Sequence, residues 1–418
     1  MSGRTSELGL TWPKGSAHAV SRAAGPSASE QPGRSADAVA WVEQVINDAI
    51  ERRASDVHFE PFRAQLRIRM RIDGQLQDVA SPAGARSPEI ASRIKVLAQM
   101  DIAEQRVPQD GRLEWPTKGR KVDLRVSTLP TAFGESIVIR VLDRNNTRPH
   151  LDGLHLPSDV LEKLRLIVGR PHGLVLVTGP TGSGKTTTLY GALAELNGID
   201  RKVMTVEDPV EFKTDGLVQV SVDAAAGLTF ARTLRSFLRQ DPDVIMVGEI
   251  RDTETAQVAT QAALTGHLVL TTLHTGSAAG AVSRLFDLGV EPFLVANALE
   301  AVLAQRLVRR ICSRCRVRTK AEASQLKDLG LTETTVPAFD VFHGTGCEQC
   351  QGTGFDGRIG LFEFLEIVPV IRNLILDRSP VVTLERAATN LGFRTLRCEG
   401  VRAVRQGLTT IDEVLRHT

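Results

Sequence analysis

The stretch GPTGSGKTTTLY at residues 179–190, preceded by the apolar run LVLVT at 174–178, decides the fold of this chain. An apolar strand that enters a glycine-rich turn and then a helix forms a cradle for phosphate, because the backbone N–H groups of the turn can point inward. The positive end of the helix dipole adds to this attraction. The pattern G-x4-G-K-T therefore predicts a nucleotide-binding loop.

Each part of this loop has an expected role in holding a nucleotide triphosphate. Lys185 is expected to reach the β- and γ-phosphates, and the hydroxyl of Thr186 is expected to ligate Mg²⁺. The alternative is a glycine-rich turn with an accidental lysine, and the strand and helix patterns on either side argue against it. The residues predicted to bind ATP and Mg²⁺ are Gly179, Pro180, Thr181, Gly182, Ser183, Gly184, Lys185, Thr186 and Thr187.

The composition is typical of a globular protein with more than one domain. The 418 residues are 42% hydrophobic, which is enough for two or three cores. The formal net charge is only +2, which argues against a protein whose main work is to coat nucleic acid. The sequence has neither an apolar run of the roughly 20 residues that cross a bilayer nor a signal-peptide core. We therefore expect a protein that is neither secreted nor membrane-spanning.

Changes of pattern along the chain divide it into segments. The first 36 residues are rich in Gly, Ser, Ala and Pro without periodicity, which predicts disorder. An apolar helical face follows at 38–50, and alternating strand patterns follow at 66–74, 122–126 and 137–141. The expected segments are 1–36 (disordered), 37–146 (small α+β domain, with a polar linker at 143–150), 147–305 (nucleotide domain), 306–360 (cysteine-containing module) and 361–418 (helical region).

Residues 151–300 alternate apolar strand patterns with helical patterns. Near-continuous apolar strands separated by helices predict a mainly parallel sheet that is covered by helices on both faces. The predicted strands are 174–178, 202–208, 243–249 and 267–274, and the predicted helices are 186–196, 230–239 and 253–264. This part of the chain is therefore expected to have an α/β fold.

Acidic residues end two of these strands, at the side where open α/β sheets bind their ligands. Glu207 and Asp208 are the last residues of the second strand, and Glu249 is the last residue of the third. Hydrolysis of ATP needs a positioned water, and Glu249 is the better candidate for polarising it, with Glu207 as the second candidate. Asp208 is equally well explained as the cap of a following helix.

Two histidines bracket the last predicted strand, seven residues apart: His267 begins it and His274 ends it. A lone histidine at a strand end is usually structural. Two histidines at the sheet edge that carries the phosphate loop would be suited to sensing the γ-phosphate. We predict that both belong to the catalytic site and keep a structural role as the alternative.

Four of the five cysteines form two pairs of the Cys-x2-Cys type. Two such turns in a cytosolic chain suit tetrahedral Zn²⁺ better than disulfides, because their thiolates can converge on one metal ion. The 31 residues between the pairs exceed the common spacing, so an insertion is expected there. The predicted zinc ligands are Cys312, Cys315, Cys347 and Cys350, and Cys398 is predicted to be an ordinary thiol.

Several further stretches, taken with the phosphate loop and the cysteine pairs, resemble one family of motors. They are VEDPVEF (206–212), RTLRSFLRQDPDVIMVGEIRD (232–252), TGHLVLTTLHT (265–275) and LAQRLVRRIC (303–312), with ASDVHFEP, RIDG, VSTLPTAFGES and GLTTIDEVLR outside them. This set resembles the Walker A, aspartate-box, Walker B and histidine-box motifs of the secretion ATPases, over about residues 37–418. Type II secretion assembly ATPases are the most similar, and pilus-assembly ATPases come next.

The resemblance implies a fold and a way of working. The implied fold is a RecA-like P-loop ATPase domain with a mainly parallel sheet, preceded by a small α+β domain and followed by a zinc-binding module and C-terminal helices. The implied protein is a cytoplasmic homo-hexamer that lies against the inner membrane through its partners. It hydrolyses ATP to ADP and phosphate and drives pseudopilus assembly and protein export through a polytopic platform protein.

The resemblance also implies roles for single residues. In similar proteins two arginines of the preceding domain reach the phosphates, and they match Arg125 and Arg140 here. Taken alone, the strand pattern around these arginines favours a solvent-exposed face. The Walker B stretch carries Gly248 where many P-loop ATPases have a Mg²⁺-binding aspartate, which leaves Mg²⁺ to Thr186 and waters.

The sequence leaves alternatives open for the membrane partner and for what the motor moves. Fuller type II members carry an additional N-terminal domain that docks the cytoplasmic part of a bitopic inner-membrane protein. Only about 36 residues precede the match here, so that partner is left open. The basic stretch from Arg306 to Lys320 leaves a motor that moves DNA as one alternative, against which the small net charge argues. A nucleotide-gated scaffold without useful turnover is another, against which Glu249 argues.

Overall fold

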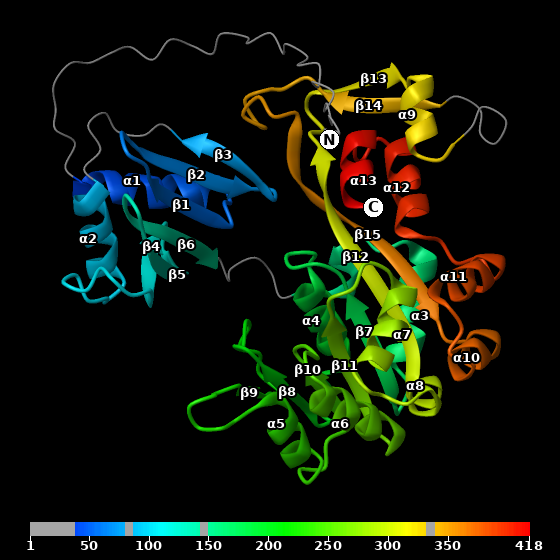
Figure 1. The fold of residues 1–418 in the computed structure, drawn as a ribbon. Helices are drawn as coiled ribbons and strands as arrows, with labels where there is room; N and C mark the ends of the chain where they lie inside the picture. The colour runs from blue at the N-terminus through cyan, green and yellow to red at the C-terminus, as the bar shows by residue number, and fades with distance from the viewer. Residues whose placement is uncertain (1–37, 80–86, 143–148, 332–338) are drawn as a thin grey trace, which may run out of the picture.

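The computed structural model describes residues 38–79, 87–142, 149–331 and 339–418 (Figure 1). The disorder predicted for 1–36 lies outside these ranges, as does most of the linker predicted at 143–150. Within them the strands form three sheets, of six, seven and two strands. None of the described helices is long and apolar enough to cross a membrane.

The first sheet is antiparallel, in the order β3–β2–β1–β6–β5–β4. Its strands are β1 (Asp56–Pro61), β2 (Leu66–Ile72), β3 (Gln75–Val79), β4 (Gln109–Thr117), β5 (Arg120–Thr131) and β6 (Gly134–Leu142). Helices α1 (Ala38–Glu51) and α2 (Ser87–Leu97) share one apolar core with alternate residues of these strands. In β2, Leu66, Ile68 and Met70 are buried while the arginines between them are not, which leaves the other sheet face polar.

The second sheet has seven strands in the order β15–β12–β7–β11–β10–β8–β9. Neighbours from β12 to β9 are parallel, and the edge strand β15 is antiparallel to β12. The strands are β7 (Gly173–Thr178), β8 (Val203–Glu207), β9 (Leu217–Ser221), β10 (Val244–Val247), β11 (Leu268–Leu273), β12 (Leu299–Ile311) and β15 (Phe355–Glu366). The predicted, mainly parallel sheet is thus confirmed.

Helices cover both faces of this sheet, which is why every residue of its central strands β7, β8, β10 and β11 is buried. One core holds α5 (Phe230–Phe237), α6 (Thr253–Leu264), α7 (Ala278–Asp287), α8 (Pro292–Ala298), α10 (Pro369–Leu376) and α11 (Val381–Asn390). The core on the opposite face holds the 3-10 helix η1 (Leu151–Leu154), α3 (Ser158–Val168) and α4 (Lys185–Leu196).

The long strands β12 and β15 run on past the rest of the sheet to a separate group of elements (Figure 1). These are β13 (Arg316–Lys320), α9 (Ala323–Asp328), β14 (Asp340–Gly344), α12 (Leu396–Arg405) and α13 (Ile411–His417). β13 and β14 form the two-stranded sheet. The segment boundaries expected at 305/306 and 360/361 stay predictions, and β12 and β15 each run across one of them.

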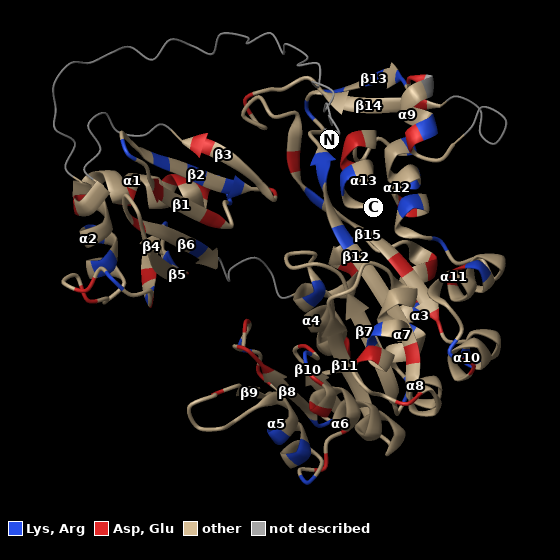
Figure 2. Cartoon of the chain, viewed as in Figure 1, with Lys and Arg blue, Asp and Glu red and all other residues tan. Residues whose placement is uncertain are grey.

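The first sheet contacts this end of the chain through the turn between β2 and β3. The backbone N–H of Gly357 donates to Asp73 at 2.9 Å, and Arg309 donates to the side chain of Gln75 at 2.9 Å. Figure 2 shows basic residues along both β2 and the outer part of β12. These contacts join residues of the small α+β fold to β12 and to the first residues of β15.

Candidate nucleotide site and metal centre

The glycine-rich loop lies between β7 and α4, as the sequence predicts. Gly179, Gly182 and Gly184 have φ angles of 151°, 77° and 89°, which side-chain-bearing residues rarely adopt. A Cβ atom at Gly179 would lie 2.5 Å from the backbone oxygen of Gln305 on β12. The loop therefore needs glycine for its close approach to β12 as well as for its turn.

Lys185 is the first residue of α4, and its side chain folds back over the loop. Its Nζ donates hydrogen bonds to the backbone oxygens of Gly179 at 3.0 Å and Pro180 at 3.1 Å. Burial lowers the pKa of this amine. Lys185 has no ion pair among the described residues, so a bound phosphate would supply the opposite charge. Thr186 and Thr187 are exposed next to it, in the first turn of α4.

Gln305 on β12 is hydrogen-bonded to the loop, and its neighbour Arg306 contacts the segment after β11. Gln305 donates through Nε2 to the backbone oxygen of Ser183 at 2.6 Å and accepts from the Thr188 hydroxyl at 2.8 Å. Arg306 donates to the backbone oxygen of Gly276 at 2.5 Å, and its charge further lowers the pKa of the loop lysine. The sequence pattern indicates only a basic stretch at Arg306 and predicts no role for Gln305. The apolar run AVLA just before them was the signal of a buried strand.

Glu249 lies just beyond β10, at the sheet edge that carries the loop. One carboxylate oxygen accepts from Arg251 at 2.6 Å, and the other lies 3.3 Å from Nε2 of His274. Burial would raise the pKa of Glu249, but Arg251 and His274 hold this pKa below its ordinary value. The carboxylate is therefore ionised at neutral pH and able to accept a proton from water. The structure brings Glu249, His274 and Lys185 to one edge.

Glu207 ends β8 and is 3% exposed. Its carboxylate accepts hydrogen bonds from the hydroxyl groups of Tyr190 and Thr205, each at 2.7 Å. These contacts tie the end of β8 to α4, and the catalytic role of Glu207 stays a prediction. The alternative of Asp208 as a helix cap is wrong, because the next helix is α5 and its cap is Thr229.

The two histidines lie at opposite edges of the sheet. His274 follows β11 at the edge of the phosphate loop, whereas His267 precedes β11 and its backbone oxygen accepts from Gly173, the first residue of β7. The prediction that both histidines share the edge of the loop is therefore wrong for His267. Residues that bracket a six-residue strand are separated by its length, about 20 Å.

Arg125 on β5 and Arg140 on β6 lie opposite each other on the polar face of the first sheet. Arg140 pairs with Asp56 at 3.1 Å, and Arg125 reaches across to Glu211, in the segment after β8, at 3.4 Å. Nε of Arg125 is buried and has no partner in the described part of the chain, which leaves a donor for an anion. The phosphate contacts of both arginines stay predictions.

Gly248 occupies the Walker B position at which many P-loop ATPases have an aspartate. Its N–H donates to the backbone oxygen of Val206 at 2.8 Å, and its own oxygen accepts from Thr272 at 2.8 Å. A Cβ atom at Gly248 would lie 3.3 Å from the Val206 oxygen, so a side chain would fit only if its neighbours moved. The exposed hydroxyl of Thr186 is the side-chain oxygen suited to Mg²⁺ at the loop itself.

The four predicted zinc ligands converge in space. Their sulfur atoms all lie within 4.8 Å of one another, with 3.8 Å between Cys312 and Cys347 and 3.8 Å between Cys315 and Cys350. Four sulfurs about 2.3 Å from a central Zn²⁺ would be about 3.8 Å apart, whereas a disulfide needs about 2.05 Å. Burial would raise the pKa of Cys350, but N–H groups of Cys347 and Gly354 lower it to about 6. The donor set therefore fits Zn²⁺.

Where the structure describes it, the insertion expected between the cysteine pairs contains β13, α9 and β14. Its two strands begin and end close to the pairs, and Thr345 donates to the backbone oxygen of Cys315 at 3.1 Å. Cys398 lies on α12, is exposed and does not belong to the cluster.

Comparison with known proteins identifies one family over nearly the whole chain. The family described as "Type II/IV secretion system protein" matches residues 34–416. The type II secretion system ATPase E of Vibrio cholerae is 48% identical over 380 residues, which are 90% of this chain and 74% of that one. The type IV pilus assembly ATPase PilB of Myxococcus xanthus is 45% identical over 385 residues, covering 92% and 68%.

Solved structures agree in fold. The pilus retraction motor PilT with bound ADP is 26% identical with a TM-score of 0.60, covering 90% of this chain and 96% of that one. The ATPase DotB of Legionella pneumophila, 24% identical, has the same fold with a TM-score of 0.68, covering 92% and 96%. On its sequence, fold and site, the chain belongs to the family of type II/IV secretion system proteins.

Proposed function

We propose that this chain is the motor ATPase of a type II secretion system, which hydrolyses ATP to power pseudopilus assembly and protein export. One observation carries the proposal: a phosphate loop with an unpaired, buried Lys185 lies at the same sheet edge as an ionised Glu249. The family and the 48% identity to a type II secretion system ATPase support the same activity and load.

The loop binds the triphosphate. Its N–H groups and the Lys185 ammonium contact the β- and γ-phosphates, and the lysine then exchanges its bonds to two backbone oxygens for bonds to phosphate. The hydroxyl of Thr186 would hold Mg²⁺, which would supply positive charge against the phosphate oxygens. Gln305 holds the loop in place through its hydrogen bond to the backbone oxygen of Ser183.

Glu249 carries the chemistry. It accepts a proton from the water that attacks the γ-phosphorus, as the bond from this phosphorus to the bridging oxygen breaks to release ADP. Arg251 and His274 hold the carboxylate ionised and in place. His274 is also close enough to the site to respond to loss of the γ-phosphate.

Arg125 and Arg140 turn hydrolysis into movement. Guanidinium groups on the first sheet that bind the γ-phosphate tie the position of that sheet to the state of the nucleotide, and release of phosphate frees it. The contact of Arg125 with Glu211, at 3.4 Å, is long and exchangeable for a phosphate contact.

The proposed assembly is a homo-hexamer at the cytoplasmic face of the inner membrane, with a polytopic platform protein as partner and Zn²⁺ in the four-cysteine site. A type IV pilus-assembly or DNA-uptake motor is the second candidate, because PilB of Myxococcus xanthus is 45% identical. Co-purification with the platform protein of a type II system would favour the first. ATPase activity that is stimulated by DNA and sensitive to salt would favour a DNA-uptake motor.

ATP turnover per chain is expected to rise with protein concentration, because arginines of a neighbouring subunit or domain complete the charge around the phosphates. Phosphate release should be measured from dilute to concentrated protein, alongside the oligomeric state. Arg125→Gln should flatten the rise, while the exposed Arg310→Gln, a matched control on the outer part of β12, should keep it. A turnover per chain that stays constant across the range of assembly would contradict the proposed site.

A further inference from the structure

A single buried carboxylate joins the N-termini of two helices that are far apart in the sequence. Glu363, on β15, is 3% exposed. Its two oxygens accept hydrogen bonds from the backbone N–H groups of Ala278, at 2.6 Å, and Leu396, at 3.0 Å. These are the first residues of α7 and α12. Both helix dipoles favour the negative charge of Glu363.

On one side this junction reaches the nucleotide site. The segment 274–277 connects β11 to α7, and its first residue is His274, the partner of Glu249. The next residue, Thr275, donates from its N–H to the hydroxyl of Thr178 at 3.0 Å. Thr178 is the residue immediately before the phosphate loop. A change at the γ-phosphate that moves segment 274–277 therefore reaches the start of α7.

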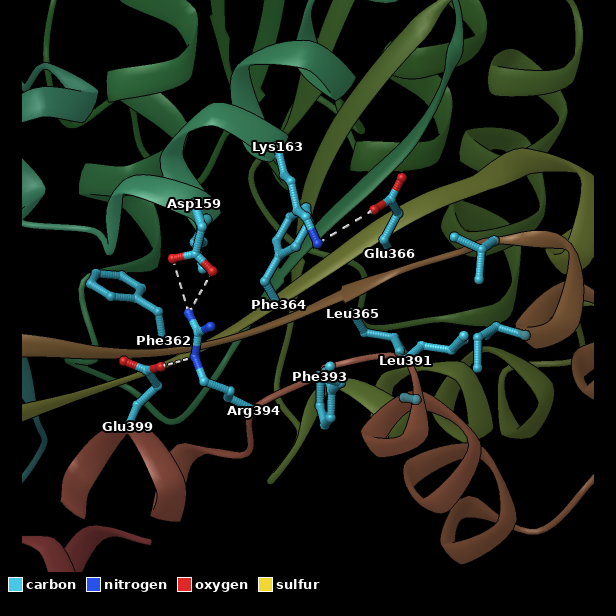
Figure 3. Close-up of a pocket in the computed structure, with 15 residues that line it drawn as sticks. Asp159, Lys163, Phe362, Phe364, Leu365, Glu366, Leu391, Phe393, Arg394 and Glu399 are labelled. Atoms are coloured by element: carbon cyan, nitrogen blue, oxygen red, sulfur yellow. Dashed lines mark hydrogen bonds and ion pairs between the residues drawn. The ribbon is translucent and has the colours of Figure 1, made fainter. Parts of the chain in front are cut away.

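On the other side the start of α12 is fastened to α3 (Figure 3). Arg394, two residues before α12, donates to both carboxylate oxygens of Asp159 on α3, at 3.0 and 2.7 Å, and pairs with Glu399 of α12. Figure 3 shows Arg394 between these two carboxylates, next to Phe362 and Phe364 on either side of Glu363 in the sequence. The start of α12 is thus held between β15 and α3.

Packing alone does not explain a carboxylate at position 363, because burying a carboxylate is costly. Burial raises its pKa, against the effect of the two N–H groups and of Arg306. It has no ion pair among the described residues, and its two oxygens match two fixed donors. A glutamine could match only one of them, because its NH₂ group would face the other N–H. The site therefore selects a carboxylate.

We propose that Glu363 is a positioning residue that transmits the state of segment 274–277 at the nucleotide to α12, and so to the far end of the chain. The inference rests on the proposed function, since it needs a nucleotide at the phosphate loop. It adds a route from the nucleotide to α12 that passes through β15 and does not involve the arginines of the first sheet.

Hydrogen exchange of the full chain, with and without Mg²⁺ and a non-hydrolysable ATP analogue, tests this route. In the natural protein the first turns of α7 and α12 should both become protected, by about tenfold in exchange rate. In Glu363→Gln the phosphate loop and α7 should still respond while α12 does not. Turnover (kcat) should fall roughly tenfold, because the link from the nucleotide to α12 is lost. KM should stay within about twofold, because Glu363 makes no contact with the nucleotide.

The matched control is Glu413→Gln. Glu413 is 1% exposed and accepts from the backbone N–H and the guanidinium of Arg309, without contact to segment 274–277. Its loss should leave the response of α12 unchanged. If Glu363→Gln does not fold, Glu363→Asp, which keeps the charge, takes its place and should weaken the response of α12 selectively.

Two results would overturn the inference: no response of α12 in the natural protein when the loop responds, or an equal response in Glu363→Gln. Absence of protection at the phosphate loop itself would mark failure of the proposed function instead.

Discussion

Glu249→Gln is expected to lower ATP turnover by a factor on the order of 10²–10⁴, the range that a positioned general base contributes. The amide keeps the size and hydrogen-bonding reach of the side chain but accepts no proton. Nucleotide affinity should stay within a few-fold of the natural protein, since the loop and Lys185 are untouched. Single-turnover phosphate release and analogue binding, measured on the same preparations, separate the two effects.

Glu254→Gln serves as the control for this experiment. Glu254 is an exposed residue in the first turn of α6, five positions along the chain, and pairs with Arg235. Its loss should leave turnover unchanged. A Glu249→Gln protein with natural turnover would show that another group activates the water.

Removal of the metal is expected to have the largest effect on stability. Structural Zn²⁺ sites contribute about 10–16 kcal/mol of apparent binding energy, and this is folding energy where no preformed site exists. The insertion of β13, α9 and β14 packs through a small core with α12 and α13, so the metal supplies much of its anchorage. Chelation, or Cys350→Ser, should therefore unfold this end at a lower temperature than the nucleotide domain.

Metal analysis of the reduced protein and thermal unfolding followed by limited proteolysis would measure the loss. Cys398→Ser is the control, because Cys398 is exposed and lies apart from the cluster. Freshly purified, reduced protein with no zinc, or a Cys350→Ser variant of natural stability, would contradict the assignment.

The sequence predicted the elements whose signal is local. The strand and helix on either side of the phosphate loop, and helix α6, follow from apolar runs and helical periodicity within a few residues. The four-cysteine site follows from spacing and residue chemistry alone. The prediction for His267 is wrong because β11 separates the two histidines that bracket it, so they lie at opposite ends of this strand.

The remaining site residues depend on pairing between distant strands. Gln305 reaches the loop because β12 pairs with β7, and the next residue, Arg306, reaches Gly276 in the segment after β11. Glu363 lies opposite Ala304 because β15 pairs with β12, and its carboxylate contacts the start of α7. No local sequence pattern predicts contacts that depend on the pairing of strands distant in the sequence. In the sequence, the stretch from Arg306 to Lys320 shows only an excess of basic residues, although β12 carries the first of them to the nucleotide edge.

The most direct test of the proposed nucleotide site is a calorimetric titration of the natural chain and of Lys185→Ala with Mg²⁺ and a non-hydrolysable ATP analogue. The natural protein is expected to bind one nucleotide per chain, and Lys185→Ala to lose affinity on the order of 10²-fold, since charge-assisted bonds from Lys185 to phosphate are removed. No binding to the natural chain, or equal binding to both proteins, would contradict it.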